Sequence, residues 1–413
     1  MNTFEKISVV GLGHIGLPTA AVFANKGVKI VGTDKNEAVV DSINAGKPHF
    51  YEPNLDVLVR RVVESGKLSA STAVMPADAF LVAVPTPLCG DGHVDLSYVQ
   101  AAAEAIAPVL EAGNLVILES TSPVGTTEKM AQWMAAIRPD LSFPHQKGEM
   151  SDVNIAHCPE RLLPGRTIEE VVNNARVIGG MTRKCAQRAL SLYRIVVQTE
   201  CKVTNARTAE MSKLTENAYR DVNIAFANEL SVICDRHNIN VWELIQMANL
   251  HPRVDILSPG PGVGGHCIAV DPWFIVDGAP EDAKIIRMAR EINDAMPKVV
   301  CNKVAQQAMS LAKPVIACLG LTYKADVDDL RESPAVDVVL ELADMAVGEL
   351  LVVDPLVQQL PQSLAELGLS LTDFDVAVDR ANVILLLVDH GAFKSIDREL
   401  IKDKIVVDTR GIW

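Results

Sequence analysis

The glycine-rich turn GLGHIG at residues 11–16 is the feature that most constrains how this chain can fold. A strand-like segment, KISVV, leads into the turn, a helix-like segment follows it, and a second strand-like segment, VKIVGTD, ends in Asp34. Strand, glycine turn, helix, strand and acid form the context in which G-x-G-x-x-G indicates dinucleotide binding on a parallel sheet. The sequence therefore predicts an α/β chain that opens with a Rossmann-like domain.

The three glycines of the turn and the acid have separate roles in such a site. Gly11 allows the tight turn, Gly13 lets the pyrophosphate approach the backbone, and Gly16 lets the helix pack on the strand. The helix N-terminus then faces the phosphates. The carboxylate of Asp34 can accept both ribose hydroxyls and repels a 2′-phosphate, so the predicted cofactor is NAD rather than NADP.

Two further strand-like segments end in turns that carry a threonine, Thr86 in AFLVAVPTP and Thr121 in NLVILESTSPVG. Ligands of open parallel sheets lie beyond the carboxyl ends of the strands. Both threonines are therefore expected to line the cofactor crevice, although each could instead cap a helix.

The rest of the chain divides into a helical centre and a second α/β region. Residues 208–238 contain no Gly or Pro and carry apolar residues at helical spacing, which predicts one long helix. The other face of this helix carries a polar stripe of Glu210, Lys213, Asn217 and Arg220. On spacing alone such a stripe is a solvated surface. Strand-like and helix-like segments then alternate again without a glycine fingerprint, so the last region should bind a different ligand or help to enclose the first.

Charge and cysteine content argue against several classes of function. The formal net charge of -14 argues against nucleic-acid binding, which needs a basic surface. The N-terminus lacks the pattern of a secretory signal and no apolar run has membrane-spanning length, so a cytoplasmic protein is expected. The eight cysteines are scattered and form no C-x-x-C pair, which argues against a disulfide framework or a metal site.

Cys267 differs from the other cysteines because it lies in a loop of glycines and prolines, SPGPGVGGHCIAVDP at 258–272. Oxidation of an alcohol to an aldehyde needs only a base and NAD, whereas oxidation of the aldehyde to an acid first needs a nucleophile. A thiolate supplies one: it forms a thiohemiacetal, which loses a second hydride to give a thioester that water hydrolyses. On the loop alone, a buried structural cysteine is an equal alternative.

Five segments resemble the nucleotide-sugar 6-dehydrogenases, a family that includes UDP-glucose, GDP-mannose and UDP-N-acetylhexosamine dehydrogenases. In chain order the segments are GLGHIG, CPERLLPG at 158–165, AEMSKLTENAYRDVNIAFANEL at 209–230, PGPGVGGHCIAVDP at 259–272 and YKADVDDLRESP at 323–334. Together they cover essentially the whole chain.

The resemblance implies an α/β fold with two Rossmann-like doubly wound parallel-sheet domains, joined by a long central helix and a helical dimerisation domain. The implied boundaries are 1–200 for an N-terminal NAD-binding domain, 201–305 for the central helical dimerisation domain with the cysteine loop, and 306–413 for a C-terminal UDP-sugar-binding domain.

Within the family, HPRV at 251–254 and the cysteine loop resemble the branch that acts on UDP-N-acetylmannosamine. The implied reaction is a four-electron, NAD-dependent oxidation at C6 to the uronate, for surface polysaccharides such as enterobacterial common antigen. UDP-N-acetylglucosamine and UDP-glucose remain alternative substrates. More distant alternatives are a two-electron dehydrogenase of the hydroxyacid type and a non-catalytic NAD-binding regulator, and neither would depend on Cys267.

The resemblance also implies catalytic roles. Cys267 matches the nucleophile, and Lys213 and Asn217 match residues that donate hydrogen bonds to the oxyanion formed at C6. Asp271 matches a carboxylate that helps to place or activate water together with the lysine. The matches leave open how Lys213, Glu160 and Asp271 divide the proton transfers.

Two residues that follow predicted strands complete the implied catalytic set. Glu160 matches a glutamate implicated in base catalysis and thioester hydrolysis, and Thr121 lies where a threonine holds the hydrolytic water. Near Glu160, Cys158 is expected to be a small apolar filler rather than a second nucleophile. Pro164 stands where some relatives carry a glutamate near the cofactor.

The remaining implied positions bind ligands. Arg253 matches an arginine that reaches the substrate of a partner subunit, so a homodimer is expected. Arginine suits phosphate contacts because its planar guanidinium can bind two oxygens. The positions implied for NAD are Gly11, Gly13, Ile15, Gly16, Asp34, Thr86, Thr121 and Arg331. Those implied for the UDP-sugar are Arg161, Lys213, Asn217, Arg253, Gly264, Lys324 and Arg410.

Overall fold

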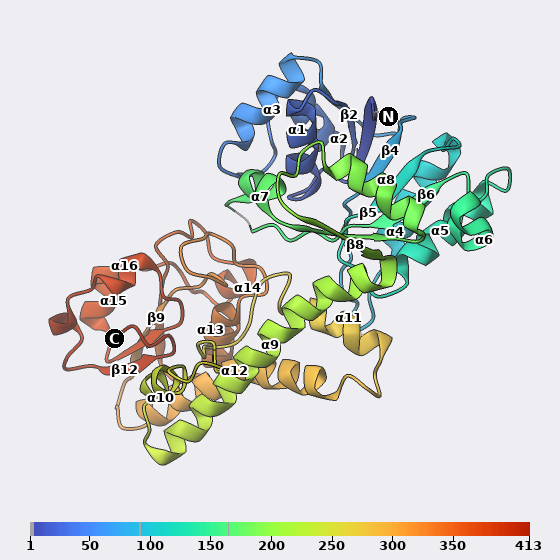
Figure 1. Ribbon diagram of the computed structural model, residues 1–413. Coiled ribbons are helices and arrows are strands. Elements are labelled where there is room, and N and C mark those ends of the chain that lie inside the picture. The colour runs from blue at the N-terminus through green and yellow to red at the C-terminus, as the bar shows by residue number, and fades with distance from the viewer. Residues whose placement is uncertain (1–3, 91, 164) are drawn as a thin grey trace. The chain divides into compact units, whose positions relative to one another are not determined.

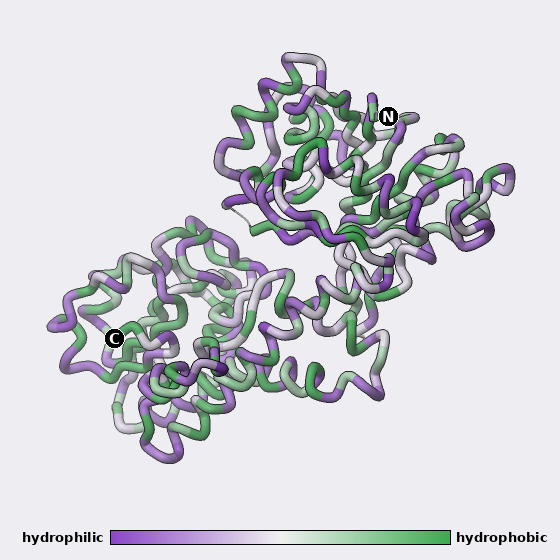
Figure 2. The backbone as a smooth tube through the Cα atoms, in the orientation of Figure 1, coloured by the Kyte–Doolittle hydropathy of each residue, from purple (hydrophilic) through white to green (hydrophobic). Residues whose placement is uncertain are grey.

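The computed structural model describes residues 4–90, 92–163 and 165–413 (Figure 1). Pro164, the position where some relatives carry a glutamate, lies outside the described residues. The chain forms two compact units, Met1–Thr215 and Glu216–Trp413. Hydrophobic and hydrophilic stretches alternate along the chain in both units (Figure 2).

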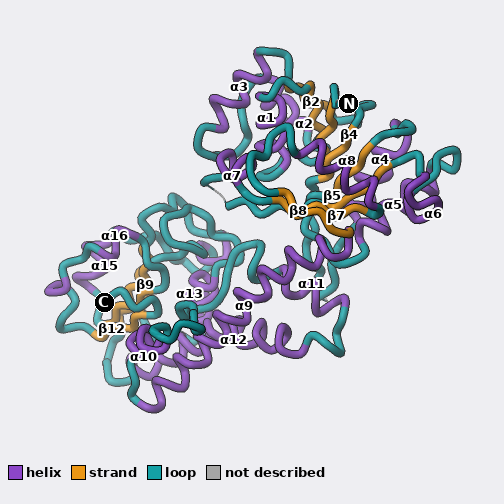
Figure 3. Tube along the Cα trace, in the orientation of Figure 1, coloured by secondary structure: helices purple, strands orange, loops and turns teal. Residues whose placement is uncertain are grey.

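The first unit is built on one eight-stranded sheet (Figure 3). In order across the sheet, the strands are β3 (Leu68–Ser71), β2 (Lys29–Thr33), β1 (Lys6–Val10), β4 (Ala79–Val82), β5 (Leu115–Leu118), β6 (Asn154–His157), β7 (Arg176–Gly180) and β8 (Cys201–Asn205). Strands β1 to β6 are parallel, β7 pairs antiparallel with β6, and β8 is parallel to β7. The sheet is therefore parallel where the glycine turn leaves it and mixed at one edge.

Helices cover both faces of this sheet, which explains why its central strands are apolar throughout. In β4, Leu81 faces the core that contains residues of α1 (Gly16–Asn25), α3 (Leu55–Glu64) and α8 (Arg183–Tyr193), whereas Val82 faces the core formed with α4 (Ser97–Ile106) and α5 (Thr126–Ile137). The other helices of the unit are α2 (Glu37–Asn44), α6 (Pro144–Lys147) and α7 (Thr167–Asn173).

A single long helix, α9 (Ala206–His237), follows β8 directly and contains the division between the two units. The helix predicted from the periodicity of residues 208–238 is confirmed. It is followed in the second unit by α10 (Val241–Ala248), α11 (Asp271–Gly278) and α12 (Lys284–Ala308).

The second unit contains a four-stranded sheet in which every strand pair is parallel. Across the sheet the strands are β10 (Glu349–Val353), β9 (Val315–Leu319), β11 (Val383–Leu386) and β12 (Ile405–Asp408). Neighbouring residues of β9 again face opposite cores: Cys318 packs with residues of α12 and α13 (Pro334–Asp344), and Leu319 packs with residues of α15 (Phe374–Arg380). Two short helices, α14 (Gln362–Ala365) and α16 (Gly391–Lys394), complete the unit.

The two α/β sheets confirm the predicted fold class. A helical dimerisation domain and the domain boundaries at 200 and 305 remain predictions. Among the helices that the structure describes, none combines the length and the apolar character needed to span a bilayer.

Candidate active site

The glycine turn of the first unit joins β1 to α1, and its glycines meet different surroundings. A Cβ on Gly11, whose φ is 91°, would lie 2.3 Å from the carbonyl oxygen of Ala83, and one on Gly16 would lie 1.8 Å from that of Gly11. No atom lies within 4 Å of a Cβ placed on Gly13. Packing therefore accounts for Gly11 and Gly16, whereas the space beside Gly13 is open to a ligand.

The start of α1 and the end of β2 fit a dinucleotide. The residue before α1, Ile15, provides no side-chain cap. In the first turn the N–H of Leu17 already donates to the Gly13 carbonyl oxygen at 3.1 Å and Pro18 has no N–H, so the helix dipole is what favours a phosphate at this end. Asp34 is half-buried: its Oδ2 accepts a hydrogen bond from Leu12 N–H at 3.1 Å and its Oδ1 accepts one from Asn36 N–H at 3.0 Å. Each carboxylate oxygen can accept more than one hydrogen bond, so this fixed carboxylate can also receive ribose hydroxyls.

The structure brings together the two threonines predicted from strand ends. The hydroxyl of Thr86, after β4, donates to the carbonyl oxygen of Thr121, after β5, at 2.7 Å. Neither threonine caps a helix, because the N-cap residues of α4 and α5 are Leu96 and Gly125. Their shared place beyond two adjacent parallel strands is the edge where such sheets bind ligands.

Glu160, after β6, is buried and both its oxygens are engaged. Its Oε2 forms an ion pair with Arg176 NH1 at 2.6 Å, and its Oε1 accepts the backbone N–H of Arg161 at 2.6 Å. The Arg161 side chain reaches the Ala175 carbonyl oxygen at 3.4 Å. Nearby Cys158 is fully buried, which raises the pKa of its thiol to about 12, as suits a filler residue and not a nucleophile.

Behind Glu160 lies an acid that the sequence did not single out. Glu119, after β5, is buried, and its Oε1 accepts the hydroxyl of Tyr193 at 2.6 Å. Burial and the negative charge of Glu160 raise the pKa of Glu119 to about 7, against the opposing effects of Arg176 and Tyr193. The only signal for this group in the sequence is a carboxylate placed directly after an apolar strand.

The polar stripe on α9 divides into structural and candidate catalytic residues. Glu210 is buried: its Oε1 accepts from Thr127 N–H at 2.8 Å and from the Thr127 hydroxyl at 2.6 Å, and its Oε2 accepts from Gly125 N–H at 2.7 Å. It therefore satisfies backbone donors at the start of α5. Lys213 is half-buried and Asn217 is buried, so neither belongs to a fully solvated face.

In the second unit, the structure brings together three residues with predicted catalytic roles. Cys267 is exposed, and its carbonyl oxygen accepts the backbone N–H of Asp271 at 2.8 Å, one turn later at the start of α11. The buried carboxylate of Asp271 accepts a hydrogen bond from Asn217 Nδ2 at 2.5 Å. This bond fixes the orientation of the Asn217 amide and leaves its second N–H for another acceptor.

Close packing explains the glycines before Cys267. A Cβ on Gly264 would lie 2.3 Å from the carbonyl oxygen of Glu332, and one on Gly265 would lie 2.8 Å from the ring of Tyr323. The cysteine loop therefore lies directly against the segment 323–334. Arg331, in that segment, forms an ion pair with Asp329 at 2.5 Å and interacts electrostatically with Cys267.

Three of the cations assigned to the UDP-sugar come from separate loops of the second unit. Lys324 and Arg253 are exposed, and Arg410 is half-buried with its Nε bonded to Asp389 Oδ1 at 3.1 Å. The guanidinium of Arg410 also lies against Gly260, where a Cβ would be 2.5 Å from NH1. The start of the cysteine loop and Arg410 are thus adjacent.

Comparisons with known proteins identify the family. Residues 5–197 match the NAD binding domain of the UDP-glucose/GDP-mannose dehydrogenase family, residues 207–295 match its central domain, and residues 317–413 match its UDP binding domain. The chain belongs to this family.

Individual relatives of the dehydrogenase span nearly its full length. The UDP-N-acetyl-D-mannosamine dehydrogenase of Campylobacter jejuni is 58% identical over 98% of this chain and 99% of that protein. The NDP-N-acetyl-D-galactosaminuronic acid dehydrogenase of Ralstonia nicotianae is 58% identical over 99% of this chain and 96% of that protein. The solved UDP-D-ManNAc dehydrogenase of Pyrococcus horikoshii has a TM-score of 0.88 at 40% identity, covering 99% of this chain and 96% of that one.

These matches confirm the predicted family and NAD as the cofactor of the dehydrogenase. The chain is an NAD-dependent nucleotide-sugar dehydrogenase, which excludes the alternative of a non-catalytic NAD-binding regulator. The roles assigned to individual residues remain predictions.

Proposed function

We propose that the dehydrogenase oxidises the C6 alcohol of UDP-N-acetylmannosamine to the carboxylic acid. One sugar nucleotide, two NAD and one water give one uronic acid, two NADH and two protons. The observation that carries the proposal is the hydrogen-bonded pair Asn217–Asp271 beside the exposed Cys267, in a chain with relatives named UDP-N-acetyl-D-mannosamine dehydrogenase.

The proposed chemistry has two oxidations joined by a covalent step. Bound NAD supplies the hydride acceptor for both oxidations. The thiolate of Cys267 adds to the C6 aldehyde to give a thiohemiacetal, and after the second oxidation the sugar is held as a thioester. Lys213 and the second N–H of Asn217 donate to the C6 oxyanion, and preorganised donors of this kind supply about 3 kcal/mol each.

Hydrolysis of the thioester completes the reaction. Asp271, held by Asn217, helps with Lys213 to place the attacking water, and Glu160 and Thr121 contribute to the same step. Water attacks the thioester carbonyl, the bond to Cys267 Sγ breaks, and the thiol is released with the acid.

Both ligands have candidate contacts. The uncapped start of α1, the open space beside Gly13, and Asp34 fit the pyrophosphate and the ribose of NAD, with Ile15, Thr86 and Arg331 as further contacts. For the UDP-sugar we propose the residues Arg161, Lys213, Asn217, Arg253, Gly264, Lys324 and Arg410.

We further propose that the enzyme is a homodimer. A groove along α9 and α12 is lined mostly by apolar residues, together with Asn223, Glu229, Arg253 and Asp255. Large apolar side chains on it are exposed, among them Tyr219 at 65%, Ile285 at 68% and Met288 at 55%. A second copy would cover this surface and bring Arg253 toward its substrate. The proposal includes a cytoplasmic location and a product that serves surface polysaccharides such as enterobacterial common antigen.

A stoichiometric titration tests the proposal. Limiting UDP-N-acetylmannosamine is incubated with excess NAD, and NADH is counted by absorbance per sugar consumed, with UDP-N-acetylgalactosamine, UDP-N-acetylglucosamine and UDP-glucose in parallel. Two NADH from the manno sugar and little from the others are expected. One NADH per sugar would refute the thioester route. Preference for UDP-N-acetylgalactosamine would instead assign this enzyme a galacto substrate, in keeping with the name of the Ralstonia relative.

A further inference from the structure

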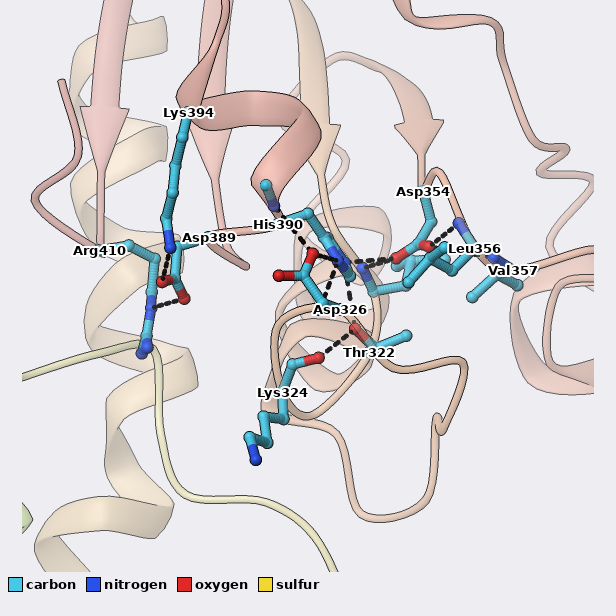
Figure 4. A network of polar contacts seen from close by, with 12 residues as sticks. Thr322, Lys324, Asp326, Asp354, Leu356, Val357, Asp389, His390, Lys394 and Arg410 are labelled. Atoms are coloured by element: carbon cyan, nitrogen blue, oxygen red, sulfur yellow. Dashed lines mark hydrogen bonds and ion pairs between the residues drawn. The ribbon is translucent and has the colours of Figure 1, made fainter. Parts of the chain in front are cut away.

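Two consecutive residues after β11, Asp389 and His390, contact the two segments that carry Lys324 and Arg410 (Figure 4). We propose that Asp389 and His390 are positioning residues that fix these two cations for the UDP-sugar. The proposal rests on the proposed function and adds to it the part of the fold that orients the sugar-nucleotide contacts.

The His390 ring is fully buried, and its hydrogen bonds define its orientation. Its Nδ1 accepts the backbone N–H of Asp326 at 3.0 Å, so in the neutral ring the proton is on Nε2. Nε2 lies 3.1 Å from the Thr322 hydroxyl oxygen and 3.3 Å from Asp354 Oδ2. The ring thus links the loop after β9 to the carboxylate after β10.

These bonds hold the Lys324 backbone from both sides. The Thr322 hydroxyl donates to the Lys324 carbonyl oxygen at 2.8 Å and lies against His390. Two residues after Lys324, the N–H of Asp326 bonds to the ring, and its carboxylate accepts Gly391 N–H at 2.9 Å. The exposed Lys324 side chain points away from the ring (Figure 4). The buried hydrogen bonds therefore fix the backbone position from which the flexible Lys324 side chain extends.

Asp389 holds the second cation through one nitrogen. Its Oδ1 bonds to Arg410 Nε at 3.1 Å, and its Oδ2 forms an ion pair with Lys394 at 3.0 Å. Binding through Nε fixes the plane of the guanidinium while the outer NH1 and NH2 groups remain directed elsewhere, one of them toward Gly260. That arrangement suits a guanidinium that presents its two outer nitrogens to phosphate oxygens.

A purely structural role would also explain buried bonds, so the experiment compares the affinity for the sugar nucleotide with kcat and the NAD KM, which a general loss of structure would also change. The variants are Thr322→Val, which removes the hydroxyl that bonds to the Lys324 carbonyl, and His390→Gln, which keeps a donor in place of Nε2. Asp389→Asn removes the charge beside Arg410. Lys394→Ala is the matched control, because it removes the other partner of Asp389 and is not assigned to the substrate.

Four quantities are measured on the full-length enzyme: the Kd for UDP alone by calorimetry, the KM for the sugar nucleotide and for NAD, and kcat. We expect Thr322→Val and Asp389→Asn to raise the UDP Kd and the sugar-nucleotide KM about tenfold, with kcat and the NAD KM within about twofold. A further variant, His390→Ala, removes both ring nitrogens and should change the same two quantities more than His390→Gln does. Lys394→Ala should change neither.

The idea is overturned if folded Thr322→Val and Asp389→Asn bind UDP within about twofold of the wild type, or if kcat falls while UDP affinity is unchanged. Loss of UDP affinity in Lys394→Ala as large as in Asp389→Asn would also contradict it. A failure of the proposed function looks different: the wild type would bind UDP but release no NADH with any UDP-sugar, and the UDP Kd values would still decide the roles of Asp389 and His390.

Discussion

The two sheets end their first strands in the same way, although only one carries the glycine fingerprint. Gly11 after β1 has φ 91° and donates to Thr33 O at 2.8 Å, and Gly320 after β9 has φ 92° and donates to Val353 O at 2.8 Å. In each sheet the next residue, a leucine, donates to an aspartate after the second strand, at 3.1 Å to Asp34 and at 2.7 Å to Asp354.

The difference lies in what else reaches the aspartate. Asp34 is half-buried and can still accept ribose hydroxyls, whereas the Asp354 side chain has no exposed surface and lies 3.3 Å from His390 Nε2. The distance to the next helix also differs. In the first unit α1 begins at Gly16, directly after the turn that contains Gly11, whereas in the second unit α13 begins only at Pro334, well after Gly320. The same strand-end design therefore leaves a half-buried carboxylate able to accept ribose hydroxyls in one sheet and forms an internal support in the other.

The largest effect should come from the cysteine loop, which belongs to neither strand end. Cys267→Ala removes the proposed nucleophile, so we expect acid formation to fall by more than about a thousandfold. Calorimetry with NAD and with UDP should give Kd values within about twofold of the wild type, because the proposed role of the thiol lies in the covalent step and not in binding either ligand. Substantial acid production by this variant would exclude the thioester.

The same substitution at the two equivalent aspartates should separate their functions. Asp34→Asn removes the charge that repels a 2′-phosphate, so the ratio of kcat/KM for NADP to that for NAD should rise about tenfold. Asp354→Asn is the matched control and should leave this ratio unchanged. A ratio unaltered by Asp34→Asn would mean that another residue reads the ribose.

Asp354→Asn should instead reduce stability. Burial opposes ionisation of Asp354, but its hydrogen bonds with His390 and with the N–H groups of Leu321 and Leu356 prevail and lower its pKa. An amide places an N–H group against these donors, at a cost of about 3 kcal/mol. Chemical unfolding should show this loss for Asp354→Asn and a smaller one for Asp34→Asn; equal losses would remove the distinction between the two strand ends.

The smallest effect concerns a buried acid of the first sheet whose pKa moves the other way. The pKa of Glu119 is raised to about 7, so the stability that its proton contributes is complete below the unfolded value of 4.5 and is lost as the pH rises through 7. Glu119→Gln should therefore gain about 2–3 kcal/mol over the wild type between pH 5 and pH 8. Thermal unfolding across this range measures the gain, and parallel curves for both proteins would contradict the assignment.

Local sequence patterns allowed much of the fold and of the candidate site to be predicted. The glycine turn, Asp34 and the helix of residues 208–238 are each coded within a short window. The cysteine loop was predicted as unusual because its glycines and prolines lie close together in the chain. The structure adds the close neighbours of two of the glycines, the Glu332 carbonyl oxygen at Gly264 and the Tyr323 ring at Gly265.

The contacts that escaped prediction join residues far apart in sequence. Glu119 meets Tyr193, and His390 meets Thr322, only because of the order of strands in each sheet. Apolar strand segments give neither that order nor the direction of the strand, so the antiparallel pairing of β7 was also not predictable. A single glycine such as Gly320 gives no fingerprint by itself, and its likeness to Gly11 becomes visible only in the backbone.

The three hydrogen bonds of Glu210 have a mechanical consequence for α9. An α-helix turns by about 100° per residue, so a side chain tied to a fixed point also fixes the directions in which its neighbours on that helix point. Glu210 is tied to Gly125 and Thr127 at the start of α5. Glu210 therefore fixes the rotation of the first turns of α9 about the helix axis, so Lys213, one turn further along, has a fixed direction relative to the first sheet before any ligand binds.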